Sequence, residues 1–276
     1  MKPRLLIFAG PNGSGKSTLT TAAMLDHFGI TDRIYGAGPR FYINADEIAV
    51  YLAENFPEMS QEEREQNAFR RARWLRLNYR LLRQSFAFET VFSHPSTLLD
   101  MQLCKAAGFE VVVVFVTTHN PEINVERVAG RYLSGGHDVP VERIRSRYKR
   151  TMALLPRILE EANRWFVFDN SGMAPELIAS FDGDTRTDHA LSEFWTTHLI
   201  EPMKQRSWRW QGAPDAFPPD LANGEYTGEI HKLTSHSVIQ KVDSRLVRHD
   251  RLLLRAELSV GQVVTVKYKD AVGEVL

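Results

Sequence analysis

The sequence has 276 residues, with 34 basic and 34 acidic side chains, so its formal net charge is zero. Hydrophobic residues make up 43% and charged residues 25%, a composition typical of a globular protein with a buried core. The charge balance argues against a surface built for nucleic acid. The single cysteine excludes an internal disulfide and a cysteine-based zinc site. Neither a membrane-spanning run nor a signal peptide is recognisable, so we expect a cytoplasmic protein without a membrane partner.

A phosphate-binding motif lies near the N-terminus. Apolar residues 5–10 predict a short buried strand, and residues 16–28 predict a helix. Between them stands the sequence Gly10-Pro11-Asn12-Gly13-Ser14-Gly15-Lys16-Ser17-Thr18. This is G-x-x-x-x-G-K-S in the strand–loop–helix context that a P-loop requires. Its backbone N–H groups would cradle phosphates, Lys16 would reach the β- and γ-phosphates, and the Ser17 hydroxyl would ligate Mg²⁺. We therefore predict an ATP site with Mg²⁺ formed by these nine residues.

Strands and helices then alternate along the first 200 residues. Further strands are predicted near residues 41–44, 86–92, 110–116 and 166–171. Helices are predicted from the capping box Ser60–Glu63 to about Phe86, and over 97–107, 121–134 and 140–163. This alternation predicts an α/β fold with an open, mostly parallel P-loop kinase sheet and helices on both faces. Ligands gather at the carboxyl ends of such strands, where Gly10, Asp46, Glu89 and Asp169 would meet.

The character of the sequence changes near residue 200. Residues 201–222 are rich in proline and tryptophan and are interpreted as a linker. After them, β-like stretches near 228–230, 237–242, 252–258 and 262–268 are separated by glycines and predict a small all-β, barrel-like module. We therefore expect a kinase-like domain over 1–200, a linker over 201–222 and a β module over 223–276.

Two strand ends distinguish a kinase from a motor ATPase. Thr117 and Thr118 follow the buried strand where a motor ATPase normally carries an acid for magnesium, so that class is disfavoured. Asp46 could accept the proton of an attacking hydroxyl, as a general base does in phosphoryl transfer. The alternatives are that Asp46 caps the N-terminus of a helix and that Glu89 is a solvated acid at the end of its strand.

Arginines are concentrated in two regions. Residues 126–150 carry seven basic and three acidic side chains, a net charge of +4, interrupted by Gly135-Gly136. Two helices joined at this break could close as a lid that brings an arginine onto the transferring phosphoryl group. Within it, Arg143, Arg145 and Lys149 are interpreted as a solvated face, and Arg127 is left open. The arginines of residues 70–83 lie on several helix faces and are interpreted as solvated.

Four segments together resemble the zeta-toxin group of P-loop kinases. They are the loop 10–18, the segment 44–48 around Asp46, the segment 88–93 around Glu89, and the lid residues 131–140 with 143–148. The resemblance covers about residues 1–180. It implies an ATP-dependent phosphotransferase whose substrate is a nucleotide sugar, UDP-N-acetylglucosamine, and whose acceptor is the sugar's 3′-hydroxyl. It also implies a toxin of a toxin–antitoxin system with an antitoxin protein as partner.

The same resemblance implies roles for individual residues. Lys16 binds phosphates, Asp46 is the base and Arg131 stabilises the transferring charge. The substrate side comprises Asn44, Glu89, Thr90 and His137, and Asn170 is assigned to the nucleotide side. Zeta toxins carry a second lid arginine near the position of His137, so either Arg147 or His137 supplies that contact here or the chemistry is weaker.

The C-terminal residues resemble, more weakly, the KfrB-type module of plasmid proteins. The matching segments are 225–230, 236–240, 247–251 and 268–270. From residue 224 onward eight basic side chains face seven acidic ones, which does not favour autonomous DNA binding. Two alternatives to the nucleotide-sugar kinase stay open. One is a kinase of a different small-molecule hydroxyl, and the other is a non-enzymatic, nucleotide-gated binding protein that acts through the β module.

Overall fold

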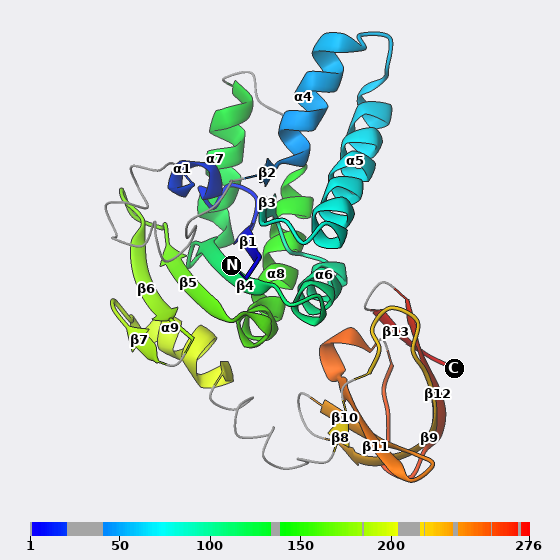
Figure 1. The fold of residues 1–276 in the computed structure, drawn as a ribbon. Coiled ribbons are helices and arrows are strands. Elements are labelled where there is room, and N and C mark those ends of the chain that lie inside the picture. The colour runs from blue at the N-terminus through cyan, green and yellow to red at the C-terminus, as the bar shows by residue number, and fades with distance from the viewer. Residues whose placement is uncertain are drawn as a thin grey trace.

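The computed structural model contains two β-sheets and a set of helices arranged mainly around the first sheet (Figure 1). The structure describes residues 2–20, 41–133, 139–183, 185–203, 216–217, 219–233, 237–254, 256–269 and 272–276. Most of the helix expected over 16–28, the Gly135-Gly136 break and most of the linker lie outside these residues.

The larger sheet has seven strands in the order β2-β3-β1-β4-β5-β6-β7. Its strands are β1 (Arg4–Ala9), β2 (Phe41–Ile43), β3 (Phe86–Thr90), β4 (Glu110–Thr117), β5 (Arg164–Asp169), β6 (Glu176–Phe181) and β7 (Arg186–Asp188). The pairings among β1 to β5 are parallel, and β6 and β7 add an antiparallel edge. The predicted open, mostly parallel sheet is confirmed. The two edge strands were not predicted.

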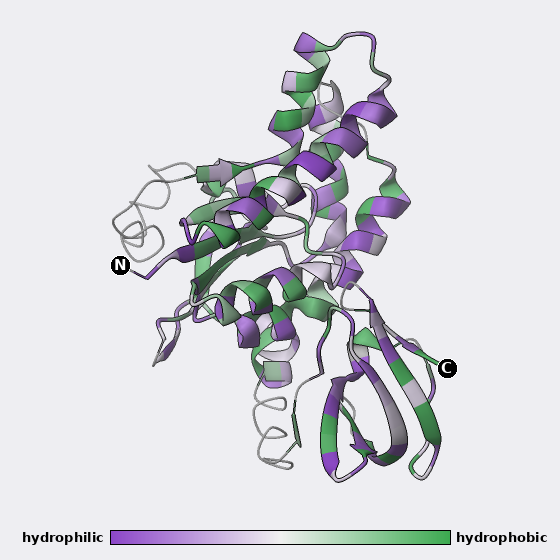
Figure 2. Ribbon diagram, turned by 45° about the vertical axis from the view of Figure 1, so that its right-hand side comes forward, coloured by the Kyte–Doolittle hydropathy of each residue, from purple (hydrophilic) through white to green (hydrophobic). Residues whose placement is uncertain are grey.

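Both faces of this sheet are buried, which explains the unbroken apolar runs in its central strands. Leu5 and Ile7 belong to one apolar cluster, whereas Leu6 and Phe8 belong to a second cluster. Successive side chains of a strand point to opposite faces, so a strand covered on both sides is apolar throughout. The hydrophobic colouring of the central strands in Figure 2 follows from this double burial.

Helices flank the sheet and carry several of the side chains of the site. They are α1 (Lys16–Leu19), α4 (Ala45–Asn55), α5 (Gln61–Leu81), α6 (Ser96–Ala106), α7 (Pro121–Leu133), α8 (Val141–Glu161) and the short α9 (Glu193–Trp195), which continues into the π-turn η1 (Thr196–Ile200). The predicted capping box is present, with Ser60 and Glu63 bonded reciprocally. α5 ends at Leu81, earlier than the expected end near Phe86. Arg83 adopts φ +53° beyond this end, and Leu82 is 66% exposed. None of the described helices is long and apolar enough to cross a membrane.

The second sheet forms the C-terminal β module. Its strands are β8 (Ala216–Phe217), β9 (Glu225–Leu233), β10 (Ser237–Val242), β11 (Arg245–Asp250), β12 (Val263–Lys269) and β13 (Val272–Val275), in the order β13-β12-β9-β10-β11-β8. A bridge between Leu254 and Gly273 joins the segment after β11 to β13, so the sheet curves towards closure as the barrel-like prediction required.

The expected strand over 252–258 is wrong. The strand lies earlier, as β11, and the 3-10 turn η2 (Arg251–Leu253) follows it. β10 turns into β11 at Asp243, which adopts φ +52°. Aspartate tolerates this left-handed conformation without the glycine that usually marks a hairpin, so the sequence carried only a weak signal for the turn. β8 adds residues from the expected linker to the same sheet.

Candidate functional site

The phosphate loop follows β1 and leads directly into α1, as the motif predicts. Gly10 adopts φ +150°, and a Cβ atom there would lie 1.9 Å from the carbonyl oxygen of Val116. Gly15 adopts φ +88°, and its Cβ atom would lie 2.1 Å from the side-chain nitrogen of Asn170. The two positions therefore need glycine both for their conformation and for space. The loop is built to approach a ligand with its backbone.

Two asparagines from distant strands and helices hold the loop in place. Asn124 of α7 donates to the carbonyl of Asn12, and Asn170 after β5 donates to the carbonyl of Ser14, each at 2.8 Å. Asn124 is fully buried. Sequence reasoning missed Asn124, because an asparagine within a helix belongs to no motif. Asn170 lies beside the loop, but the structure gives it a supporting bond to Ser14.

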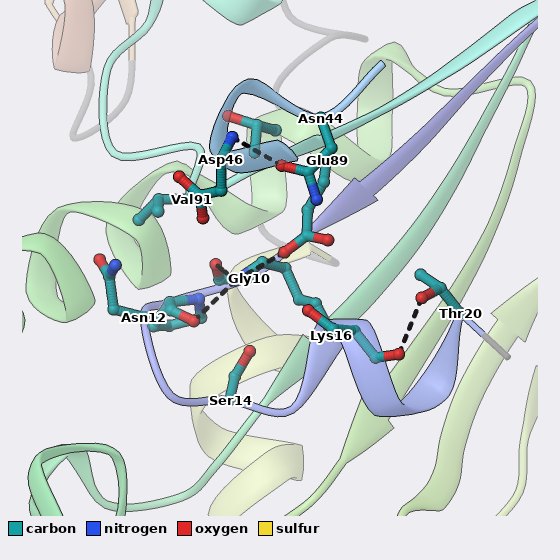
Figure 3. A network of polar contacts seen from close by, with 12 residues as sticks. Gly10, Asn12, Ser14, Lys16, Thr20, Asn44, Asp46, Glu89 and Val91 are labelled. Atoms are coloured by element: carbon teal, nitrogen blue, oxygen red, sulfur yellow. Dashed lines mark hydrogen bonds and ion pairs between the residues drawn. The ribbon is translucent and has the colours of Figure 1, made fainter. Parts of the chain in front are cut away.

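Lys16 is buried, with 7% of its surface exposed. Its Nζ donates to the carbonyls of Gly10 and Pro11 at 2.9 and 3.0 Å and lies 3.9 Å from Oε1 of Glu89 (Figure 3). Burial lowers the pKa of Lys16, and the nearby carboxylates of Glu89 and Asp46 act in the opposite direction. Lys16, Glu89 and Asp46 therefore interact electrostatically in one site.

Asp46 is exposed and lies in the first turn of α4, but it is not the residue that caps this helix. Asn44 is the N-cap, and its side-chain oxygen accepts a 2.9 Å hydrogen bond from the backbone N–H of Asp46. The helix-cap alternative for Asp46 is therefore wrong. The Asp46 carboxylate lies on the same side of the phosphate loop as Glu89 (Figure 3).

Glu89 is largely buried, so the solvated alternative is wrong for this residue as well. Its side chain is 15% exposed and accepts a 2.9 Å hydrogen bond from the hydroxyl of Tyr42. Beyond it, Thr90 accepts from the backbone N–H of Phe92, which is buried and adopts φ +56°. A non-glycine residue in this conformation is strained, and such strain concentrates at binding sites.

The lid arginines have different surroundings. Arg131 is exposed, and its charge acts to lower the pKa of Lys16. Arg147 of α8 contacts Oδ1 of Asn12 at 3.3 Å.

Arg127, whose role the sequence left open, donates to the carbonyls of residues 170 and 172 and supports that loop. Arg145 pairs with Glu122 and Glu142 on the surface, as expected for a solvated face. His137 lies outside the described residues.

Many of these residues line one cleft of about 950 Å³. Its walls contain the predicted residues Asn12, Gly13, Gly15, Lys16, Ser17, Thr18, Asn44, Asp46, Glu89, Thr90, Arg131 and Arg147. Two arginines of α5, Arg73 and Arg76, also line it, so a wholly solvated role for the arginines of residues 70–83 is wrong. Arg76 lies 4.7 Å over the ring of Phe88 and 3.5 Å from Asp100.

The surroundings of Ser17 and of the strand ends indicate how a metal could be held. Ser17 is exposed and lines the cleft. The described residues contain no group of three or more His, Cys, Asp or Glu that could hold a metal ion. Asp169 accepts from the indole N–H of Trp195 at 2.7 Å and is not among the described residues lining the cleft. Thr117 ends β4 and Thr118 follows it; both are buried, and motor ATPases carry an acid at this place. This donor set fits a magnesium ion that arrives with nucleotide phosphates.

Two comparisons relate parts of this chain to known proteins. The KfrB Domain family matches residues 225–276. An uncharacterized protein of Haemophilus influenzae is 27% identical over 150 residues, which are 54% of this chain and 94% of that protein.

Solved structures share the fold at low sequence identity. The native complex of AvrRxo1-ORF1 and -ORF2 contains a chain with a TM-score of 0.55 and 15% identity, and the match covers 74% of this chain and 63% of that one. The complex with ATP gives a TM-score of 0.53 and 15% identity over 84% and 69% of the two chains. The present chain thus spans somewhat under two thirds of the chain in the native complex. These likenesses show that the chain shares the α/β fold of these structures.

Proposed function

We propose that this chain is an ATP-dependent kinase that phosphorylates a hydroxyl group of a small molecule. The observation that carries the proposal is the single cleft that joins the phosphate loop to Asp46 and Glu89. A phosphate loop alone serves many nucleotide-binding proteins. A carboxylate facing it across the same cleft adds the group that a phosphoryl transfer to a hydroxyl needs.

The phosphate loop forms the nucleotide side. Loop N–H groups and the Lys16 ammonium stabilise the negative charge of the phosphates. When phosphates enter, Nζ of Lys16 exchanges its bonds to the carbonyls of Gly10 and Pro11 for phosphate oxygens. Ser17 would hold Mg²⁺, whose chemistry is to neutralise charge on the β- and γ-phosphate oxygens. The structure of AvrRxo1-ORF1:-ORF2 with ATP supports this choice of nucleotide for the fold.

Asp46 acts as the general base. It accepts the proton of the acceptor hydroxyl while the hydroxyl oxygen bonds to the γ-phosphorus, and the bridging β–γ oxygen leaves with ADP. Asn44 positions Asp46 by capping α4. Arg131 and Arg147 approach from α7 and α8 and would stabilise the charge of the transferring group.

The acceptor side lies between α5 and the segment after β3. Glu89, Thr90 and Asn44 offer hydrogen bonds to a polyhydroxylated molecule, while Arg73 and Arg76 offer cationic groups to an anionic one. A nucleotide sugar has both features. Together with the zeta-toxin resemblance, this supports UDP-N-acetylglucosamine as substrate and its 3′-hydroxyl as acceptor.

The proposed biological setting rests mainly on the zeta-toxin resemblance. AvrRxo1-ORF1 was solved together with a second protein, AvrRxo1-ORF2, which supports a protein partner for the present chain. With the resemblance, we propose a toxin of a toxin–antitoxin system that acts in the cytoplasm and has an antitoxin protein as its partner. A second function is favoured by the KfrB Domain match: a nucleotide-gated binding protein that acts through the C-terminal module.

The test is to incubate the full chain with ATP, Mg²⁺ and a panel of nucleotide sugars, and to follow each compound by mass spectrometry. A kinase adds about 80 Da, one phosphoryl group, to its acceptor and forms an equal amount of ADP. Asp46→Asn is the matched control and should form product at least about 10²-fold more slowly. ATP binding without product from any acceptor would overturn the kinase proposal and favour the nucleotide-gated binding protein.

A further inference from the structure

We propose that the C-terminal β module positions α8, and through it Arg147, at the phosphate loop, with the contact between Arg157 and Asp250 as the coupling point. Arg157 and Asp250 are positioning residues in this scheme. Neither is among the described residues that line the cleft, so both act on it through α8. The proposal rests on the proposed function only in so far as Arg147 stabilises the charge of a bound nucleotide.

The coupling contact is a buried ion pair between the module and the kinase-like region. Nε of Arg157 lies 3.3 Å from Oδ2 of Asp250, and the two side chains are only 9% and 8% exposed. Arg157 also pairs with Glu160 at 3.4 Å and with Glu161 at 3.6 Å in its own helix. Separating a buried ion pair leaves an unpaired buried charge, which strongly destabilises the folded state. The pair therefore holds α8 and the end of β11 together.

The C-terminal half of α8 is fixed from a second side by α6. Gln102 donates to the Glu161 carboxylate at 3.0 Å, and Lys105 donates to the Glu161 backbone carbonyl at 3.0 Å. Apolar residues of both regions, including Leu155 of α8 and Leu254 of the module, belong to one continuous cluster. The module is therefore packed onto the kinase-like region and is more than a tethered appendage.

The N-terminal half of the same helix contacts the cleft. Arg147 reaches Asn12 of the phosphate loop, Tyr148 donates to the carbonyl of Thr118, and Thr151 donates to the carbonyl of Val91. These contacts join α8 to the loop and to the ends of β4 and β3. A shift of α8 would move all three together.

Helix geometry links the two halves. Ten residues separate Arg147 from Arg157, which is about 15 Å along a helix axis. Pro156 lies next to Arg157 and removes one backbone hydrogen bond, which makes this the natural point for α8 to bend. The anchor at Arg157 thus sets the direction in which the arm that carries Arg147 points.

Asp250 is itself attached to a rigid core. Its neighbour His249 is fully buried and bonded to Gln240 and Tyr268, and Gln240 donates to three backbone carbonyls of β9 and β12. A partner that binds the module and shifts these strands would therefore move Asp250 and, with it, α8.

Coupling between two sites is reciprocal, so nucleotide must also affect the module. The experiment is amide hydrogen exchange on the full chain with and without a saturating non-hydrolysable ATP analogue. We expect the analogue to slow exchange about tenfold in residues 245–250 as well as in α8. Unchanged exchange of residues 245–250 in the wild-type chain would overturn the proposal, whatever the chain phosphorylates.

Variants then locate the coupling at the ion pair. In Asp250→Asn, the analogue should still slow exchange at the phosphate loop but not at residues 245–250, and its affinity should fall about tenfold. Glu225→Gln is the matched control, because it breaks an exposed ion pair with Lys267 in the same module without touching α8. It should respond as the wild type does.

If Asp250→Asn does not fold, the comparison of the wild-type chain with and without the analogue decides alone. Absence of phosphorylated product would instead count against the proposed function and leave this result standing.

Discussion

The side-chain amide of Asn124 donates a 2.8 Å hydrogen bond to the backbone carbonyl of Asn12, which ties α7 to the phosphate loop. Asn124 is fully buried, and its carbonyl oxygen accepts from the hydroxyl of Thr118 at 2.5 Å. One side chain therefore joins the loop, the end of β4 and the helix that carries Arg131.

Replacement of Asn124 by Ala should weaken both stability and nucleotide binding. It leaves the Asn12 carbonyl without the Asn124 donor and leaves the Thr118 hydroxyl with the carbonyl of Asn120 as its acceptor, a loss of about 1–3 kcal/mol in the free energy of unfolding. The ATP dissociation constant should rise, as measured by titration calorimetry. Asn120→Ala is the control, since the side-chain oxygen of Asn120 accepts from the backbone N–H of Glu122 in the first turn of α7. It should lose about 1 kcal/mol of stability with unchanged ATP affinity. Equal ATP affinities in the two variants would contradict the role of Asn124.

Asp46→Asn should separate catalysis from binding. It removes the basic oxygen while Asn44 still caps the helix, so kcat should fall by about 10²–10⁴. ATP affinity should change little, and stability should fall by no more than about 1 kcal/mol, the usual value of an acid in a first helical turn. Asn44→Ala provides the contrast, with the lost cap appearing as reduced stability. Turnover of Asp46→Asn close to that of the wild type would remove Asp46 from the mechanism.

Lys16→Ala should abolish ATP-dependent turnover without unfolding the chain. Lys16 is buried, with 7% of its surface exposed. Its removal leaves the carbonyls of Gly10 and Pro11 without a donor but also eliminates a buried cation, and these effects on stability oppose each other. Thermal unfolding without nucleotide should thus stay near that of the wild type, while turnover falls at least about 10²-fold. Lys267→Ala, at an exposed ion pair, should leave both unchanged.

Cys104 should be unreactive in the folded protein. Burial in α6 raises the pKa of its thiol to about 12, so almost no thiolate exists at neutral pH. A thiol reagent such as dithionitrobenzoate should label the native chain slowly and the unfolded chain at once. The reaction is monitored by absorbance at pH 8. Because the sequence contains one cysteine, the labelling rate reports opening around α6. Fast stoichiometric labelling without denaturant would show that this packing is wrong.

The C-terminal module should lose stability in acid because of His249. Gln240 uses its amide nitrogen for backbone carbonyls, so its oxygen accepts from Nε2 of His249, and Nδ1 accepts from Tyr268. Burial lowers the pKa of His249 to about 4, against about 6.5 in an unfolded chain.

Between these values the unfolded state binds more protons, so the stability present above pH 6.5 is lost as the pH falls towards 4, by about 3 kcal/mol at most. This slope is measured as the free energy of unfolding of the module in urea, monitored by hydrogen exchange at a series of pH values from 8 to 4. His249→Gln should flatten it, whereas His231→Gln, at an exposed position, should preserve it. A slope unaffected by His249→Gln would assign the acid sensitivity to other groups.

Local patterns in the sequence were sufficient to predict the parallel part of the first sheet and the phosphate loop. The spacing of Gly10, Gly15 and Lys16 determines a phosphate loop, and unbroken apolar runs determine strands buried on both faces. The capping box at Ser60 marks the start of α5. These signals are local, because each depends on neighbours within a few residues of the chain.

Tertiary structure decided which side chains meet across the cleft. Arg76 reads as one of many arginines on a charged helix, yet packing against Phe88 and Asp100 turns it into the cleft. Asn124 supports the loop from 112 residues away. The ion pair between Arg157 and Asp250 joins regions that the sequence separates by a linker. No local periodicity encodes such contacts, since they arise only when distant elements pack against each other and exclude water.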